Sequence, residues 1–286
     1  MKLKPFHVMK AIYPCIWMNQ KAREAAAFYC SVFPDAKIEE ENDLVAMWSS
    51  GGEKFMLLNG GPKFKPNPSI SFYSIFPDEK QLEEIWNKLS VGGMIMMPLD
   101  SYPWSKKYGW LEDKYGVSWQ LESNVPEGIS QRYVPAFMFT AAQFGRAEEA
   151  IAFYTSLFPE SSSLFISRYG DDAGDQAGKV NHAQFMLSGQ RFAAMDSSFT
   201  HAFTFSEGMS LVVPCDTQEE IDFFWEKLGE GGEESMCGWL KDRFGVSWQI
   251  VPAKLGEMMA DPEKGPRVVQ AFMKMKKFDI QALQDA

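Results

Sequence analysis

Polar side chains alternate with apolar ones in the segment 117–122, in an arrangement that suits ligand binding. Ser118, Gln120 and Glu122 share one face of the predicted strand, because successive side chains of a strand point to opposite faces. The segment 246–251 repeats the pattern with Ser247, Gln249 and Val251. Buried amides need hydrogen-bond partners, which a bound molecule can supply. We therefore expect the two glutamines and the two serines to contact a ligand.

Glu122 is the one charged side chain in this set, since Val251 stands at the corresponding position of the second segment. A carboxyl group in a binding cleft can act as a general acid or base. A surface residue at the end of a strand is the alternative interpretation. We keep Glu122 as a candidate catalytic residue.

His182 is one of three histidines and lies in the alternating segment 181–187. It shares a face with Gln184, and the apolar residues of the opposite face are expected to pack against helices. Gln184 is therefore a further candidate for ligand contact. Two interpretations of His182 stay open: a hydrogen-bonded strand histidine, or a general base or single metal ligand. Asn59, in the run Asn-Gly-Gly-Pro, belongs either to a substrate loop, where it would contact the ligand, or to a turn after a strand.

The composition excludes several classes of function. Acidic residues number 38 and basic residues 28, which gives a net charge of −10. Phosphate backbones and acidic membranes are bound by clustered Lys and Arg, so we expect neither nucleic acid nor a membrane as a partner. The 4 cysteines include no CxxC pair, which favours reduced thiols and a cytoplasmic location.

One internal repeat predicts two similar domains. Phe-Tyr followed by Phe-Pro occurs in 28–34 and again in 153–159, and Gly-Val-Ser-Trp-Gln occurs at 116–120 and again at 245–249. Each half is also doubled internally, because a strand, a helix and further strands are followed by the same order of elements.

These patterns predict an α+β protein made of two tandem domains, each with two βαβββ modules. The first domain spans 1–128 and the second 129–286, where a helical extension at 261–278 follows the last module. The segment 125–131 is the predicted linker between the domains.

Three segments resemble one branch of a known superfamily. They are the run 14–33, the Leu-Asn-Gly-Gly-Pro at 58–62, and the twice-used string that includes Cys237 to Pro252. The sequence resembles the PhnB-like branch of the vicinal oxygen chelate superfamily, which includes glyoxalases, bleomycin-resistance proteins and ring-cleaving dioxygenases. The resemblance implies that the two modules of each domain form a U-shaped mixed sheet whose concave side holds a small molecule, often with a divalent metal ion. It also implies that the two halves pair as relatives do in homodimers, so the chain is a monomer with an internal pseudo-dimer or a homodimer.

The metal ion of the superfamily is not expected in this chain. Mapping the superfamily's ligand positions onto the two halves places no usual ligand at any of them: Pro14, Pro135, Ser69, Gly208, Met56, Ala193, Gln120 and Gln249. A divalent ion needs several converging carboxylate, imidazole or thiolate donors. We therefore predict neither a metal nor another cofactor.

Three functions remain under consideration, and the sequence leaves open whether the protein is an enzyme. The first is metal-independent binding of a small organic molecule, whose identity is unassigned. The second is an isomerase, lyase or dioxygenase of the superfamily type, with His182 and Glu122 recruiting a metal ion in an unfamiliar arrangement. The third is the label 3-demethylubiquinone-9 3-methyltransferase that this branch has carried. No G-x-G-x-x-G turn, typical of nucleotide-like cofactor sites, occurs in the chain.

Overall fold

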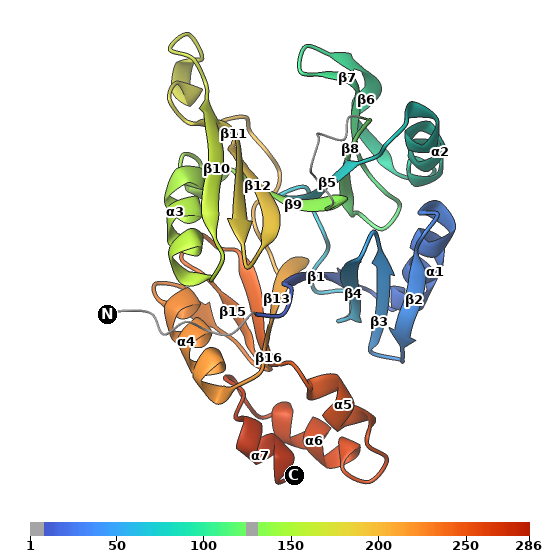
Figure 1. Ribbon diagram of the computed structural model, residues 1–286, viewed down its shortest axis with the longest axis vertical. Coiled ribbons are helices and arrows are strands. Elements are labelled where there is room, and N and C mark those ends of the chain that lie inside the picture. The colour runs from blue at the N-terminus through green and yellow to red at the C-terminus, as the bar shows by residue number, and fades with distance from the viewer. Residues whose placement is uncertain (1–8, 124–130) are drawn as a thin grey trace.

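Four βαβββ modules follow one another in the computed structural model, which describes residues 9–123 and 131–286 (Figure 1). The predicted linker at 125–131 falls almost wholly outside the described residues. Module 1 contains β1 (Tyr13–Met18), α1 (Ala22–Val32), β2 (Lys37–Glu41), β3 (Val45–Ser50) and β4 (Glu53–Asn59). Module 2 contains β5 (Ile70–Ile75), α2 (Glu79–Leu89), β6 (Met94–Tyr102), β7 (Ser105–Glu112) and β8 (Ser118–Glu122).

The second half repeats this order. Module 3 contains β9 (Tyr133–Phe139), the short η1 (Ala141–Gln143), α3 (Ala147–Leu157), β10 (Ser162–Arg168), η2 (Gly174–Gln176), β11 (Val180–Leu187) and β12 (Gln190–Asp196). Module 4 contains β13 (Met209–Cys215), α4 (Gln218–Gly229), β14 (Glu233–Glu234), β15 (Trp239–Lys241) and β16 (Ser247–Pro252). The chain ends in α5 (Leu255–Ala260), α6 (Gly265–Phe272) and α7 (Ile280–Gln284), of which only α6 lies within the predicted extension at 261–278.

The strands form two eight-stranded mixed sheets, which confirms the predicted α+β class. Sheet A has the order β14-β15-β16-β13-β1-β4-β3-β2, and sheet B has the order β10-β11-β12-β9-β5-β8-β7-β6. Sheet A thus joins module 1 to module 4, and sheet B joins module 2 to module 3 (Figure 1).

Each sheet therefore takes one module from each half, whereas we expected both modules of a sheet to come from the same half. The first strands of the modules meet in antiparallel pairs, with Cys15 opposite Ser210 in sheet A and Ser71 opposite Ala136 in sheet B. The alternation of side chains along a strand is the same for either pairing, so it cannot select between them. The two halves are thus paired inside one chain.

The helices keep each half together. In the first half α1 contacts α2, and in the second half α4 follows below the end of α3 (Figure 1). Their shared cores are aromatic: the Tyr29 ring lies 5.6 Å from that of Trp119, and the Phe158 ring lies 4.9 Å from that of Phe224. Burial of such large rings supplies most of the stabilisation of a core. Sheets thus connect the halves, and helices connect the modules within a half.

A buried aspartate fixes the start of the last strand in each half. Asp113 accepts hydrogen bonds from the Tyr29 hydroxyl at 2.8 Å and the Trp119 indole at 2.9 Å, and also from two backbone N–H groups. Asp242 accepts the same set, from the Tyr154 hydroxyl at 2.6 Å, the Trp248 indole at 2.8 Å and two backbone N–H groups. Burial raises the pKa of both carboxyl groups, and the hydrogen bonds oppose that shift. The repeated Gly-Val-Ser-Trp-Gln string is therefore a structural motif as well as a possible ligand motif.

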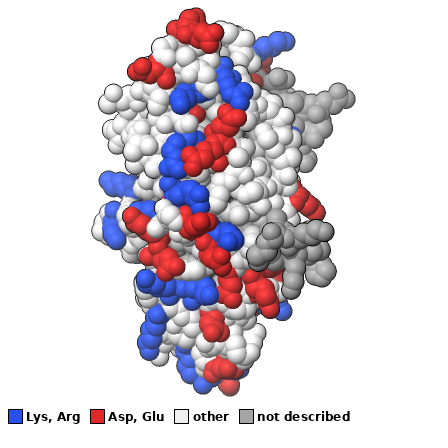
Figure 2. Space-filling model, turned by 90° about the vertical axis from the view of Figure 1, so that its left-hand side faces the viewer, with Lys and Arg blue, Asp and Glu red and all other residues white. Residues whose placement is uncertain are grey.

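Acidic and basic side chains are intermingled on the face that carries α3 and α4 (Figure 2). One ion pair there joins Arg168 to Glu148 at 2.7 Å, and another joins Arg146 to Glu149 at 2.9 Å. That face therefore presents no extended area of one charge. Among the described residues, no helix is long and apolar enough to cross a membrane.

Candidate functional site

A cavity of about 840 Å³ lies on the face of sheet A that turns away from α1 and α4. We call it cleft A. Strands β1, β3 and β4 contribute one side, β13, β15 and β16 the other, and the C-terminal helices a third. Ser247 and Gln249, which are both buried, line it from β16. The structure therefore places two of the predicted ligand-contacting residues in a cavity of the size that small ligands occupy.

The hydroxyl of Ser247 has no hydrogen-bond partner among the described residues, although the side chain is fully buried. The neighbouring Gln249 donates from Nε2 to the Ser210 hydroxyl at 3.0 Å, and that hydroxyl donates to the backbone oxygen of Cys15. A buried polar atom without a partner costs free energy, which a ligand or a water molecule can recover. The polar surface of cleft A is therefore incompletely satisfied by the protein.

The matching residues of sheet B are satisfied by the protein itself. Gln120 accepts a hydrogen bond from the Tyr108 hydroxyl at 2.7 Å and donates to the Ser71 hydroxyl at 2.8 Å. Ser118 accepts from the indole N–H of Trp110 at 2.7 Å. In sheet A, Cys237 stands where the repeat has Tyr108, so Gln249 lacks that donor.

Trp239, the counterpart of Trp110, lies against another aromatic ring in cleft A. Its ring is 5.9 Å from that of Trp17 at an interplanar angle of 76°, and Trp17 in turn meets Phe64 at 5.0 Å and 86°. The Trp17 indole donates to the backbone oxygen of Gly61 at 2.7 Å, which holds the ring in place. Edge-to-face rings of this kind present flat apolar surfaces to a ligand. Cleft A therefore combines a polar patch with an aromatic wall.

Charged side chains stand at the rim of cleft A. The acidic ones are Glu40, Glu207, Glu233, Glu234 and Glu257, and the basic ones are Lys54, Lys63 and Lys241. Lys241 is paired with Glu207 at 3.0 Å. Because acidic residues outnumber basic residues, the rim disfavours an anionic ligand.

His182 and Gln184 lie together on sheet B, where each already has neighbours. Gln184 accepts a hydrogen bond from Arg191 at 2.5 Å, and its Nε2 is 3.5 Å from the Nε2 of His182. The His182 ring lies 5.6 Å from that of Phe165 and 6.4 Å from that of Tyr73. Burial lowers the pKa of His182, which favours the neutral imidazole.

Glu122 is buried on sheet B, with 6% of its surface exposed. It lies opposite Tyr108 in the β7–β8 pair, and within the described part of the chain its carboxyl group makes no hydrogen bond. Burial raises the pKa of Glu122 to about 7. A carboxyl group with this pKa can exchange a proton near neutral pH.

Asn59 uses its amide within the protein. Its Oδ1 accepts a hydrogen bond from the backbone N–H of Ala22 at 2.9 Å, at the first turn of α1. Its Nδ2 donates to the backbone oxygen of Asp43 at 2.9 Å. In the structure this side chain therefore joins the end of β4 to the start of α1.

The positions that would hold a metal ion in the superfamily do not fit one here. The strand pairing moves the first-strand positions from our mapping, by one residue for Pro14 and Pro135 and by two for Ser69 and Gly208. Pro14 pairs with the core residue Leu211, and Cys15 faces the other side with Ser210. The residues grouped on that side of each sheet are Cys15, Met56, Ser210 and Gln249 in sheet A, and Ala136, Ala193, Ser71 and Gln120 in sheet B. Burial raises the pKa of Cys15 to about 12, so its thiol stays protonated. Within the described ranges no group of three or more His, Cys, Asp or Glu residues could hold a metal ion.

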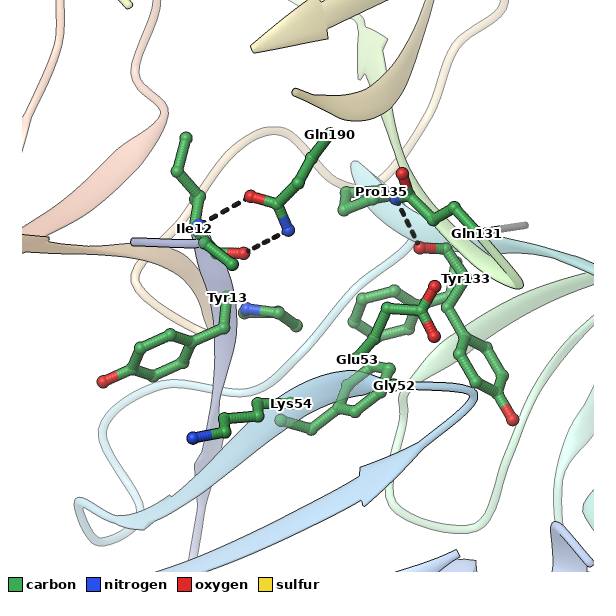
Figure 3. Close-up of a pocket in the computed structure, with 13 residues that line it drawn as sticks. Ile12, Tyr13, Gly52, Glu53, Lys54, Gln131, Tyr133, Pro135 and Gln190 are labelled. Carbon is green, nitrogen blue, oxygen red and sulfur yellow. Dashed lines mark hydrogen bonds between the residues drawn. The ribbon is translucent and has the colours of Figure 1, made fainter. Parts of the chain in front are cut away.

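A second, smaller cavity of about 130 Å³ lies where the two sheets meet (Figure 3). Gln190, the first residue of β12, accepts a hydrogen bond from the Ile12 N–H at 2.6 Å and donates to the Ile12 oxygen at 2.9 Å. Glu53, the first residue of β4, is the equivalent residue in the first half. Its Oε1 accepts a hydrogen bond from the backbone N–H of Arg132 at 2.9 Å. The Oε2 of Glu53 is buried without a partner among the described residues. No sequence pattern indicates this pair, because only the pairing of modules across the two halves brings its parts together.

The fold is that of glyoxalase I. Glyoxalase I from Zea mays superimposes with a TM-score of 0.57 over 88% of this chain and 95% of that chain, at 14% identity. This likeness concerns the fold alone. The chain belongs to the family described as 3-demethylubiquinone-9 3-methyltransferase, whose model matches twice, at residues 10–122 and 131–251.

Shorter relatives match about two fifths of the chain. A PhnB protein from Bacillus cereus is 35% identical over 38% of this chain and 96% of that chain, with a TM-score of 0.36. The protein PA1353 from Pseudomonas aeruginosa is 21% identical over 39% of this chain and 96% of that chain, with a TM-score of 0.35. The comparison with curated proteins gives no match. The two family matches confirm the predicted tandem duplication.

Proposed function

We propose that the chain binds a small organic molecule in cleft A without the help of a metal ion. The observation that carries the proposal is the difference between the two sheets in their hydrogen bonding. Ser118 and Gln120 are occupied by Trp110 and Tyr108, whereas the Ser247 hydroxyl has no partner in the described part of the chain. Sheet A therefore keeps a hydrogen-bonding group available for a ligand, whereas the equivalent groups of sheet B bond within the protein.

The cavity itself supports this proposal. Its volume of about 840 Å³ and its mixture of apolar walls with a few polar groups are typical of ligand sites. Trp17 and Trp239 offer flat surfaces to an aromatic or aliphatic group. The side chains at the superfamily's metal positions supply no set of ligands, so binding would rest on hydrogen bonds and apolar contact.

Two further proposals concern the state of the protein. Because the sheets pair the two halves inside one chain, we propose that a single chain is sufficient for cleft A. The 4 cysteines are free, which supports a reducing, cytoplasmic environment.

Binding can be tested with N-phenyl-1-naphthylamine, a neutral aromatic amine whose fluorescence rises in apolar surroundings. We expect saturable binding to the full chain. The variant Leu58→Trp should weaken it by about tenfold or more, because Leu58 lines cleft A and a larger ring there fills the cavity. Fluorescence titration measures both affinities.

The matched control is Met195→Trp. Met195 pairs with Met138 on β9 as Leu58 pairs with Trp17 on β1, so it is the equivalent position of sheet B. This variant should bind the probe within about twofold of the native affinity. Absence of saturable binding by the native chain, or equal losses in both variants, would contradict the proposal for cleft A.

A second candidate function, an acid–base reaction on sheet B, rests on Glu122. Its burial without a hydrogen bond to a described residue and its pKa of about 7 are features of catalytic carboxyl groups. We expect the ¹³C signal of this carboxyl to titrate near pH 7, and the variant Glu122→Gln to lack that titration. A midpoint near the ordinary glutamate value of 4.5 would remove the basis for this candidate.

The methyltransferase activity named in the family description ranks third. The sequence has no glycine-rich turn of the kind that binds a nucleotide-like methyl donor. Co-purification of a methyl donor with the native chain would raise this possibility again.

A further inference from the structure

The C-terminal helices form an apolar wall of cleft A. Five large apolar residues of these helices and their flanking positions line the cavity, next to Gly256 and Glu257: Leu255, Met259, Phe272, Met273 and Phe278. The family match ends at residue 251, so this wall lies beyond the part that the family model describes. In Figure 1, α5 follows the end of β16 and α6 lies beside α5.

The wall is attached to the sheet by specific contacts. The backbone N–H groups of Cys237 and Gly238 donate to the backbone oxygens of Met275 and Lys276, both at 2.7 Å. Gly238 has a φ of +77°, and a Cβ atom there would come within 2.6 Å of the Phe278 ring. Phe278 is 1% exposed. Only glycine allows this approach, so the extension is packed as part of the fold.

Sheet B has a different boundary at the equivalent place. Its hairpin is long, with β6 of 9 residues and β7 of 8, whereas β14 and β15 have 2 and 3 residues. The long hairpin carries the stacked rings of Tyr102 and Trp104, which are 5.1 Å apart. In sheet A the hairpin is short, and the C-terminal helices border the cavity instead. The two sheets therefore differ in their walls as well as in their hydrogen bonding.

Cleft A is thus polar at one place and apolar at another. Ser247 and Gln249 provide hydrogen-bonding groups on the strands, and Met259 and Met273 provide flexible apolar side chains on the helices. Methionine adapts its shape to irregular apolar surfaces. A molecule that satisfies both regions needs a hydrogen-bonding head and an apolar tail.

We infer that the C-terminal helices determine the ligand specificity of cleft A and that the ligand is an uncharged or cationic amphipathic molecule. Its head would bond to Ser247 and Gln249, and its tail would lie along Met259, Phe272 and Met273. The acidic excess at the rim disfavours anionic amphiphiles such as fatty acids. This inference rests on the proposed binding function.

The test uses primary alcohols of increasing chain length, which displace N-phenyl-1-naphthylamine from the full-length protein. For the native chain, affinity should rise by up to about fourfold for each added methylene group from 1-hexanol to 1-decanol, because each is buried against the apolar wall. In the double variant Met259→Ala/Met273→Ala, the affinity for 1-decanol should fall by about tenfold and that for 1-hexanol by less than about threefold.

The control is Val269→Ala on α6, an exposed apolar residue that does not line cleft A. It should leave the whole series unchanged. An affinity of the native chain that does not depend on chain length would overturn the inference, as would equal losses for both alcohols in the double variant. In either case the probe still binds and Leu58→Trp still weakens it, so the proposed function stands. If the native chain does not bind the probe, the proposed function itself fails.

Discussion

The variant Asp242→Ala is expected to lower the free energy of unfolding by about 3–5 kcal/mol, since four buried donors lose their acceptor. The Tyr154 hydroxyl and the Trp248 indole belong to fully buried side chains, so water cannot replace the carboxylate without disturbing the core. The same bonds hold α3 of module 3 against the last strand of module 4. Chemical denaturation followed by tryptophan fluorescence measures the change.

Two comparisons make this prediction specific. Asp113→Ala removes the equivalent acceptor in the first half and should cost a similar amount. Asp222→Ala removes an exposed partner of Lys277 and should cost no more than about 1 kcal/mol. If Asp242→Ala cost as little as Asp222→Ala, the repeated motif would have no structural role at this position.

The second large effect concerns Glu53, where the two sheets meet. Burial raises the pKa of Glu53 from 4.5 to about 7, so the folded chain binds a proton there more tightly than the unfolded chain. The resulting stabilisation is fully present below pH 4.5 and is lost as the pH rises through about 7. Glu53→Gln should therefore match the native chain in acid and exceed its stability at about pH 8.

The expected gain at about pH 8 is about 1–2 kcal/mol. The rise in the pKa of Glu53 corresponds to at most about 3 kcal/mol in the free energy of unfolding, and partial solvent access to the side chain reduces that value. The glutamine would reproduce the arrangement of Gln190, whose amide both accepts from and donates to the backbone of Ile12. Urea denaturation at several pH values gives the two stability curves.

The converse variant, Gln190→Glu, provides the control for Glu53. It places a carboxyl group against the carbonyl oxygen of Ile12 and should lose stability as the pH rises. The charged or titratable groups around Glu53 are Arg132, Tyr133 and Asp35, and Arg132 is paired with Asp35. Identical pH dependence in Glu53→Gln and the native chain would show that Glu53 does not titrate as proposed.

Sequence patterns predicted much of the secondary structure because its causes are local. The alternation in 117–122 and 246–251 corresponds to β8 and β16. The doubled order of elements predicted four modules, and four are present. Periodicity depends only on neighbours along the chain, so a single sequence contains it.

Contacts between distant residues could not be predicted in the same way. Ser118 and Ser247 occupy equivalent strings, yet one accepts a bond from Trp110 and the other has no partner in the described chain. The difference depends on Trp239 lying against Trp17, which is far away in the sequence. The role of the aspartates in the repeated motif likewise depends on distant residues, because it requires Tyr29 and Tyr154 from other modules.

The sequence by itself determined the α+β class, the tandem duplication, the strands that carry the glutamines and serines, and the absence of usual metal ligands at the mapped positions. Only the tertiary structure decided which modules share a sheet, which cleft keeps unpaired polar groups, and that the C-terminal helices border it. The physical reason is that the face a side chain occupies follows from local periodicity. The hydrogen bonds that a side chain makes and the cavity that it lines depend on the element that packs opposite its strand. The same pattern of alternation is compatible with more than one such element.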